Sequence, residues 1–427
     1  MNTKEIKQIL IDQREELETF LEDKKIIKRE VLENYTNLLK SSLIKIIIGP
    51  RRSGKSVLSF QLLKNKNFAY VNFDDERLST LETQDLNLIL QTIYEIHKKP
   101  EFIFFDEIQN ISKWELFVNR LKRQKINLIV TGSNAKLLSA ELATHLTGRH
   151  FSLELFPFSF REYLIFNEFL YFEKIFSTKE IALIKKYLND YLHFGGFPEV
   201  VQGENYKRYL VALYSTILTK DIILRHKVKY INVLKEVANY LICNFANKIT
   251  FNKLKNIFSL KSVHTVQNYF SFIEETYLIF AVKKFSYKFK ERLTAPRKIY
   301  SIDTGLINAI STKFSQEIGH IYENAVAIEL LRKKSFNEAT EIYYWEDVYG
   351  REVDFVVKQD LKIKQLIQVC YNIENYDTKQ REIKSLIKAS NELKCSNLLV
   401  ITDDYEGEEK IKGKKIKFVS LWKWLIE

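Results

Sequence analysis

The chain has 427 residues, of which 46% are hydrophobic and 28% charged, and its formal net charge is +12. Only 12 glycines and 5 prolines exclude a disordered or collagen-like protein, and the length predicts about two to four domains. Three cysteines without paired spacing exclude a disulfide framework and the common zinc-finger patterns. No apolar run approaches the ~20 residues of a membrane helix, and the N-terminus shows no apolar signal segment. We therefore expect a cytoplasmic, soluble, multidomain protein without a membrane partner.

The first part of the chain predicts a helical segment followed by an α/β domain. Residues 1–40 read as one or two polar helices, and residues 41–200 as the α/β domain. Near-continuous apolar strands that alternate with helices indicate a parallel sheet covered on both faces. The apolar runs are LIKIIIG (43–49), FAYVNF (68–73), EFIFFDE (101–107) and INLIVTGSN (126–134).

A phosphate-binding loop follows the first of these strands. The sequence GPRRSGKS fits the pattern G-x-x-x-x-G-K-[ST], and the helical sequence SVLSFQLLK comes next. Its glycines allow backbone N–H groups to face phosphate oxygens, and the helix N-terminus adds positive charge. Lys55 would reach the β- and γ-phosphates, and the Ser56 hydroxyl would bind Mg²⁺. We predict an ATP site made by Gly49, Pro50, Arg51, Arg52, Ser53, Gly54, Lys55 and Ser56.

Polar residues end the two later strands. Asp106 and Glu107 follow a fully apolar strand, and buried strands rarely end in two carboxylates without a cation. Asp106 would be the second Mg²⁺ partner, and Glu107 the base that polarises the attacking water. Asn134 would sense the γ-phosphate or orient the water, although asparagine is also a common turn residue. Because the chain lacks an N-K-x-D element for guanine, ATP is favoured over GTP.

The segment HLTGRH supplies a candidate arginine for the transition state. Arg149 would neutralise developing charge on the transferred phosphate, in cis or from a neighbouring subunit. Arg51 and Arg52 inside the loop are alternatives for that role. The predicted catalytic residues are Lys55, Asp106, Glu107, Asn134 and Arg149. An arginine supplied in trans would require a homo-oligomer.

Residues 201–300 contain 18 Lys and Arg but 6 Asp and Glu, which accounts for the whole positive excess. A charge confined to one module indicates a polyanion partner, here double-stranded DNA. Three helices in 233–278 and the basic segment VKKFSYKFKERL (282–293) have the layout of a winged helix-turn-helix. Ser262 would cap its second helix. The residues expected at a DNA groove are His264, Thr265, Gln267 and Asn268, those at phosphates are Lys253, Lys255 and Lys261, and those in the wing are Lys283, Lys284, Lys288, Lys290 and Arg292. A winged helix that docks a protein is the alternative.

Residues 301–427 predict a second α/β unit. Glu323 on a helix and Asp354 on a strand are typical of a metal-dependent nuclease core, which also needs an E-x-K pair. Here that pair reads Gln368-Val369-Cys370; glutamine is a poorer Mg²⁺ ligand than a carboxylate, and cysteine cannot replace a lysine ammonium. We therefore expect a restriction-endonuclease-like domain without nuclease activity, with metal-dependent cleavage as the alternative.

Taken together, these segments resemble the prokaryotic AAA-type ATPases of archaea and bacteria, whose C-terminal half is a separate domain family of unassigned function. The resemblance spans essentially the whole chain. It implies an additional-strand P-loop ATPase fold, a winged helix and a restriction-endonuclease-like domain, and it implies the stated roles for Lys55, Ser56, Asp106 and Glu107. The segments that carry it are GPRRSGKSVL, FDEIQNISKWE, VTGSNAKLLS, LTGRHFSLELFPFSFREYL, HFGGFPEV, TKDI (219–222), YSIDTGLINA, IYENAVAIELL, REVDFVV and IQVCYN.

The sequence thus predicts a protein that binds ATP and Mg²⁺, hydrolyses ATP and associates with DNA. Two alternatives come from other classes: a nucleotide-dependent switch that docks proteins without DNA, and a metal-dependent nuclease. Partners would be ATP or ADP, double-stranded DNA, and a protein partner or further copies of the chain.

Overall fold

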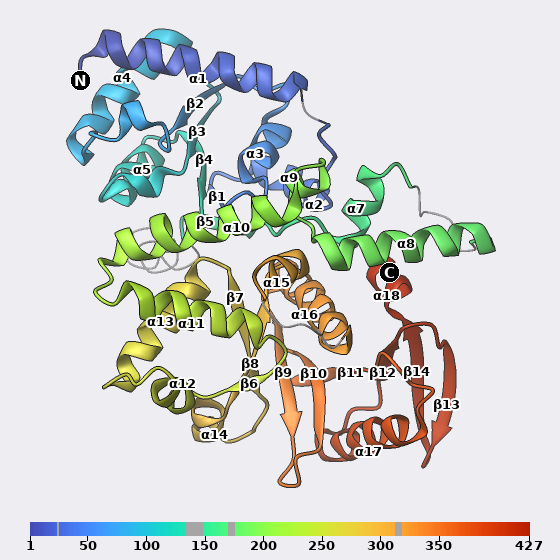
Figure 1. The fold of residues 1–427 in the computed structure, drawn as a ribbon. Coiled ribbons are helices and arrows are strands. Elements are labelled where there is room, and N and C mark those ends of the chain that lie inside the picture. The colour runs from blue at the N-terminus through green and yellow to red at the C-terminus, as the bar shows by residue number, and fades with distance from the viewer. Residues whose placement is uncertain (24, 134–147, 170–175, 312–317) are drawn as a thin grey trace. The chain divides into compact units, whose positions relative to one another are not determined.

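The computed structural model describes residues 1–23, 25–133, 148–169, 176–311 and 318–427 (Figure 1). The chain divides into two compact units, Met1–Pro157 and Phe158–Glu427, each with its own sheet. Within the described ranges, no helix combines the length and the apolar character needed to cross a bilayer.

The first unit is built on a five-stranded sheet. Its strands are β1 (Ile44–Ile48), β2 (Phe68–Asn72), β3 (Phe102–Asp106), β4 (Asn127–Gly132) and β5 (His150–Glu154). All neighbours pair in parallel, in the order β2-β3-β4-β1-β5. Strand β4 therefore lies between β1 and β3, which is the additional-strand arrangement expected of this P-loop class. The predicted α/β fold class with a parallel P-loop sheet is confirmed.

Helices cover both faces of this sheet. They are α1 (Thr3–Asp23), α2 (Val31–Thr36), α3 (Lys55–Leu63), α4 (Leu86–His97) and α5 (Trp114–Arg123), with short 3₁₀ turns η1 (Asn37–Lys40), η2 (Glu76–Leu78), η3 (Thr83–Asp85) and η4 (Ile108–Asn110). Residues of α1, α4 and α5 pack in one buried cluster, and those of α2 and α3 in another. Alternate β1 residues enter each cluster, Ile46 and Ile48 the first and Ile47 the second.

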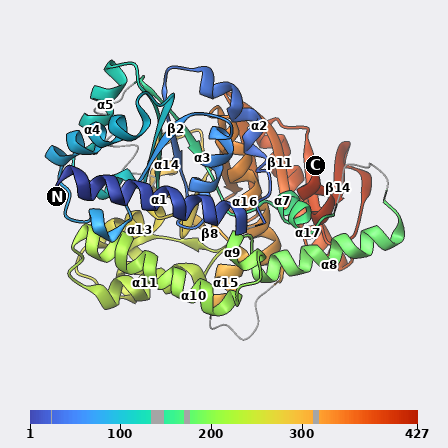
Figure 2. The same cartoon turned by 90° about the horizontal axis from the view of Figure 1, so that it is seen from above.

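The N-terminal helix α1 closes an open edge of the sheet. It packs against α4 and the edge strand β2, as the dark blue helix in Figures 1 and 2 shows. The Gln13 side chain accepts a hydrogen bond from the Asn72 N–H (2.9 Å) and donates one to the Asn72 carbonyl (3.0 Å). An amide that satisfies edge backbone groups prevents another strand from adding there.

The second unit contains a nine-stranded mixed sheet. Its strands are β6 (Lys248–Ile249), β7 (Ile279–Lys284), β8 (Arg297–Ser301), β9 (Thr340–Glu346), β10 (Glu352–Gln359), β11 (Lys362–Val369), β12 (Leu398–Thr402), β13 (Gly407–Ile411) and β14 (Lys414–Ser420). The order is β13-β14-β12-β11-β10-β9-β7-β8-β6. Because β7 pairs with β9, one sheet joins the basic segment to the C-terminal segment. The boundary expected at residue 300 lies inside β8, and the four-part division of the chain stays a prediction.

Helices again cover both faces of this second sheet. They are α7 (Phe160–Phe166), α8 (Thr178–Phe194), α9 (Pro198–Val201), α10 (Tyr206–Thr216), the π-helix η5 (Ile217–Leu224), α11 (Ile231–Cys243), α12 (Phe251–Ile257), α13 (Val263–Glu275), α14 (Phe289–Thr294), α15 (Thr304–Ile310), α16 (Ile318–Phe336), α17 (Tyr376–Leu393) and α18 (Leu421–Ile426). Residues of α7, α8, α15, α16 and α18 share one core, and α17 contributes to another. Figure 2 shows the long helices α8 and α16 of this unit.

Candidate nucleotide site

Two glycines shape the loop between β1 and α3. Gly49 has a φ of +149°, and a Cβ on it would lie 2.0 Å from the Leu155 carbonyl oxygen. Gly54, at a φ of +91°, comes directly before α3. Since only glycine adopts such angles without strain, both motif glycines are explained by backbone geometry.

The phosphate loop contains buried hydrogen-bond donors that could bind an anion. The buried Lys55 Nζ donates to the carbonyl oxygens of Gly49 (3.3 Å) and Pro50 (2.9 Å) and lies 3.6 Å from Glu107 Oε1. Ser53 Oγ is also buried, and it has no hydrogen-bond partner in the described part of the chain. Buried polar atoms are rarely left unpaired, so an unsatisfied hydroxyl in this loop fits a bound phosphate.

Asp106, at the end of β3, accepts hydrogen bonds from two hydroxyl groups and lies near a third. Thr131 Oγ1 donates to its Oδ1, Tyr70 donates to its Oδ2 at 3.3 Å, and the Ser56 hydroxyl lies near it. Burial, followed by the neighbouring Glu107 charge, raises the pKa of Asp106 to about 6. A buried carboxylate next to a serine hydroxyl is a suitable place for a hard divalent cation. The predicted Mg²⁺ partners Ser56 and Asp106 are therefore side by side.

Glu107 is fixed in a left-handed backbone conformation, with a φ of +52°. That conformation costs a non-glycine residue about 1–2 kcal/mol. The Glu107 N–H donates a hydrogen bond to Thr131 Oγ1 at 3.0 Å, which helps to hold the backbone there. Burial alone would raise the pKa of Glu107, but Lys55 and Arg51 outweigh it and the net shift is downward. The carboxylate is thus ionised at neutral pH, as a proton acceptor must be. The contacts of Tyr70 and Thr131 with the acidic pair were not predicted from the sequence. The polar Thr131 within an otherwise apolar strand was the one feature that could have indicated them.

Strand β4 pairs with β3, so the end of β4 lies near the acidic pair. Asn134 itself lies outside the described residues. Ser133 is buried near the Glu107 carboxylate, but its Oγ makes no hydrogen bond of ordinary length with the described residues. Strand β4 therefore places one polar side chain beside the proposed base.

Arg149 is not brought to the phosphate loop of its own chain. Its carbonyl accepts a hydrogen bond from the Ile44 N–H (3.0 Å), and its side chain donates to Asn119. Ile44 begins β1, whereas Gly49 follows the other end of this five-residue strand, about 16 Å away. Arg149 thus lies at the opposite end of the strands from the phosphate loop, so a catalytic role in the same chain does not fit. Arg149 could act in catalysis only at the site of a neighbouring subunit. Arg51, 3.3 Å from Asp74, lies in the site, whereas Arg52 is exposed.

An N-terminal arginine supports the phosphate loop, and the sequence pattern did not reveal it. The buried Arg29 guanidinium donates from Nη1 to the Ser53 carbonyl (2.8 Å) and from Nη2 to the Phe156 carbonyl (2.7 Å). A Cβ on Gly54 would lie 3.3 Å from Nη1. Arg29 thereby ties the loop to the segment that follows β5 and fixes the Ser53 peptide.

We expect Arg29→Met to lower kcat/KM for ATP by about 10–100-fold, because hydrogen bonds from a charged group contribute about 1.5–3 kcal/mol. Arg29→Lys should restore part of the loss, since an ammonium reaches one carbonyl. Steady-state kinetics and the melting temperature would be measured for both. The control is Arg14→Met, which removes an exposed arginine paired with Glu18 on α1 and should leave kinetics unchanged. Wild-type kcat/KM in Arg29→Met would contradict the supporting role.

The predicted C-terminal residues are partly brought together in the second unit. Glu323 on α16, Asp354 on β10 and Gln368 on β11 line one cavity of about 600 Å³. Cys370 lies in the hydrophobic core, where burial raises its pKa to about 12. Among the described residues, no group of three or more His, Cys, Asp and Glu side chains is arranged to hold a metal ion.

Comparisons with known proteins agree with this geometry. Residues 41–164 match a family described as an AAA domain. Residues 185–317 and 318–424 match two domains of unknown function, DUF8612 and DUF4143. The phosphate loop, the strand order and the AAA match define an AAA-type P-loop ATPase domain, which is a nucleotide-binding domain.

The whole chain also has relatives. It is 38% identical over 434 residues to the uncharacterized protein MJ1544 of Methanocaldococcus jannaschii, covering 94% of this chain and 96% of that protein. An uncharacterized protein of Haemophilus influenzae is 29% identical over 417 residues, covering 93% and 99%. The Walker-type ATPase PABY2304 of Pyrococcus abyssi is similar at 14% identity and a TM-score of 0.43, covering 67% of this chain and 96% of that one. The chain belongs to the prokaryotic AAA-type ATPase family that includes MJ1544, as the sequence motifs predicted.

Proposed function

We propose that the chain hydrolyses ATP to ADP and phosphate in a Mg²⁺-dependent reaction. The observation that supports this proposal is one cluster at the carboxyl edge of the first sheet: Lys55 Nζ lies 3.6 Å from Glu107, and the Ser56 hydroxyl lies near Asp106. A phosphate-binding ammonium, a cation site and an ionised base therefore occur together.

Each residue then has one role. Lys55 would exchange its loop carbonyls for phosphate oxygens and neutralise their charge. Ser56 and Asp106 would hold Mg²⁺, which supplies positive charge to the phosphates when bound. Glu107 would accept the proton of the attacking water, with its backbone fixed through Thr131. Arg51 would add positive charge next to Glu107.

Phosphate release in the presence of ATP and Mg²⁺ tests the proposal, with Lys55→Ala as the reference. This variant removes the ammonium but not the glycines that shape the loop, so it should bind ATP poorly and release no phosphate above background. A wild-type rate no higher than that of Lys55→Ala would refute hydrolysis at this site.

A second function, DNA binding, is favoured by the exposed residues between β7 and β8. We propose that α11, β6, α12, α13, β7 and β8 form a winged helix-turn-helix, since their order suits one. Helix α13 buries Val266, Tyr269, Phe270 and Ile273 and leaves a polar face made of His264, Gln267 and Asn268 exposed, with Thr265 half-buried.

The segment between the two strands alternates basic and aromatic residues. Tyr287 and Phe289 are 74% and 67% exposed, and the intervening Lys288 is also exposed, as is Lys290. Lysines can contact phosphates, while exposed aromatic rings can stack on bases. Large apolar side chains that are not used in a core support a binding role for this wing.

We expect labelled duplex DNA to bind at low salt and to be released as salt rises. Each phosphate contact contributes about 0.9 to the slope of log affinity against log salt, so Lys288→Gln with Lys290→Gln should reduce that slope by about 2. Fluorescence anisotropy over a salt series would measure it. The matched control, Lys394→Gln with Lys412→Gln, removes two exposed lysines from the C-terminal segment and should leave the slope unchanged. Binding that is absent at low salt would favour the protein-docking switch.

A further inference from the structure

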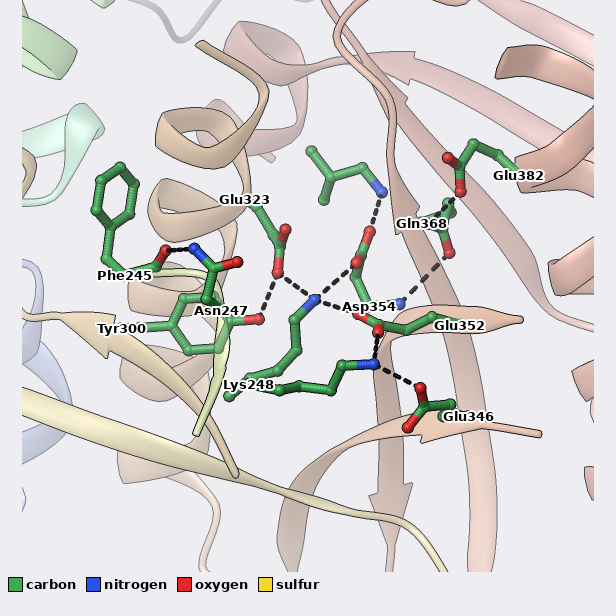
Figure 3. A network of polar contacts seen from close by, with 12 residues as sticks. Phe245, Asn247, Lys248, Tyr300, Glu323, Glu346, Glu352, Asp354, Gln368 and Glu382 are labelled. Carbon is green, nitrogen blue, oxygen red and sulfur yellow. Dashed lines mark hydrogen bonds and ion pairs between the residues drawn. The ribbon is translucent and has the colours of Figure 1, made fainter. Parts of the chain in front are cut away.

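A buried lysine lies at the centre of the C-terminal carboxylates. Lys298 Nζ lies 2.6 Å from Glu323 Oε1, 2.5 Å from Glu352 Oε1 and 3.0 Å from Asp354 Oδ1, and its side chain is 4% exposed. Tyr300 donates a hydrogen bond to the same Glu323 oxygen at 2.6 Å. Figure 3 shows the three carboxylates directed toward one another. One ammonium thus satisfies oxygens from α16 and β10 together.

The neighbouring contacts hold these carboxylates in place. Asp354 Oδ2 accepts a hydrogen bond from the Val369 N–H (2.9 Å), and the Gln368 side chain accepts one from the Asp354 N–H (3.4 Å). Gln368 also donates to Glu382 at 2.7 Å, as Figure 3 shows. Gln368 therefore fixes the backbone of Asp354 and is not directed at a cation.

We propose that the Lys298 ammonium is the resident cation of this centre, and that it masks a divalent-metal site made by Glu323, Glu352 and Asp354. The three oxygens converge within 3.0 Å of one point, which the ammonium fills. Ca²⁺ binds oxygens at about 2.3–2.6 Å and Mg²⁺ at about 2.0–2.1 Å, so a metal at that point needs the most distant oxygen, that of Asp354, to move in by about 0.4–1 Å. The point adjoins the cavity of about 600 Å³, which leaves room for water ligands.

The lysine and the carboxylates of this centre come from different segments of the chain. Lys298 lies on β8, in the basic segment, whereas the carboxylates lie on α16 and β10 of the C-terminal segment. Strand β8 belongs to the same sheet as β10, from which β7 and β9 separate it, and α16 packs against β8. A buried carboxylate cluster needs compensating charge, and here the protein supplies it from another segment.

A second lysine in the same pocket provides a matched control. Lys248 Nζ lies 2.5 Å from Glu346 Oε1 and 2.8 Å from Glu352 Oε2, and its side chain is 31% exposed. It contacts one carboxylate of the cluster from its outer side and reaches neither of the other two. Removing it should not open a metal site.

Mn²⁺ binding to the full-length, nucleotide-free protein, followed by electron paramagnetic resonance, tests the proposal. The wild-type chain should show no Mn²⁺ site that depends on Asp354. Lys298→Met should gain one site, tighter than any wild-type binding there by about tenfold or more, since affinity rises with ligand charge. The site should disappear when Asp354→Asn is added and persist when Ser56→Ala is added instead, which separates it from the nucleotide site. Lys248→Met should gain none.

Two outcomes would overturn the proposal. The first is Mn²⁺ binding to the wild-type chain that is lost in Asp354→Asn, since this would place the metal and Lys298 together. This comparison needs no Lys298 variant, so it decides the question even where Lys298→Met does not fold. The second is a folded Lys298→Met that gains no Asp354-dependent site.

Discussion

Glu107→Gln is expected to lower kcat for ATP hydrolysis by about 10²–10⁴-fold while ATP affinity stays within a few-fold of wild type. Glutamine has the same shape but cannot accept the proton of the attacking water. The backbone contact to Thr131 uses the N–H of residue 107 and is retained, so the left-handed turn should persist. Lys55 loses only an ion pair at 3.6 Å and keeps its carbonyl partners.

The measurement separates binding from chemistry. Phosphate release gives kcat, and a fluorescent nucleotide gives the dissociation constant. The control is Glu101→Gln, an exposed glutamate just before the other end of β3, paired with Lys66 at 3.8 Å. It should turn over ATP at the wild-type rate. If Glu107→Gln did so too, another group would have to be the base.

Sequence patterns identified the strands with a long apolar run, including the half-buried β2, and missed several strands that lack one. Strands β1 and β3 are entirely buried, so each is apolar apart from Lys45 in β1 and the terminal Asp106 of β3. Strand β5, with the sequence HFSLE, buries only Leu153 and has no such run. Strands β13 and β14 form an edge hairpin: β13 (GEEKI) has no buried residue, and in β14 the exposed Lys415 and Lys417 interrupt the buried Ile416 and Phe418, so neither strand begins with an apolar run.

The candidate site divides in a similar way. The loop motif and the acidic strand end are local patterns, so Lys55, Asp106 and Glu107 were predictable. Arg29 was not predictable, because its partner Phe156 lies 127 residues further along the chain and no sequence motif indicates a contact over that separation. Lys298 was missed because a nuclease core keeps its lysine next to the third element, whereas here the cation comes from another segment.

Two of the recognised segments, HFGGFPEV and YSIDTGLINA, form a structural joint in the second unit. Asp303 Oδ2 accepts the Gly196 N–H at 2.7 Å, and Oδ1 accepts the Leu306 N–H at 3.0 Å as the N-cap of α15. A Cβ on Gly195 would lie 2.1 Å from Asp303, and one on Gly305 would lie 2.0 Å from the Phe194 carbonyl. These glycines are therefore required by close packing between the end of α8 and the start of α15.

Asp303→Ala is accordingly expected to destabilise the second unit by about 3–5 kcal/mol. It removes a helix cap and leaves buried N–H groups unsatisfied, at about 1–3 kcal/mol each. For a unit of this size the melting temperature should fall by about 10 °C. Asp303→Asn keeps the shape and one acceptor oxygen, so its effect should be about half as large.

Calorimetry of the full chain would measure this effect, with nucleotide binding as an independent readout. The control is Glu338→Ala, at an exposed turn between α16 and β9, which should leave the melting temperature within about 1 °C. Nucleotide affinity should be unchanged in Asp303→Ala at temperatures where the protein stays folded, because Asp303 belongs to the second unit and the phosphate loop to the first. A melting temperature equal to that of the wild type would show that the Gly196 and Leu306 N–H groups find other partners. The recognised glycines would then need an explanation other than this joint.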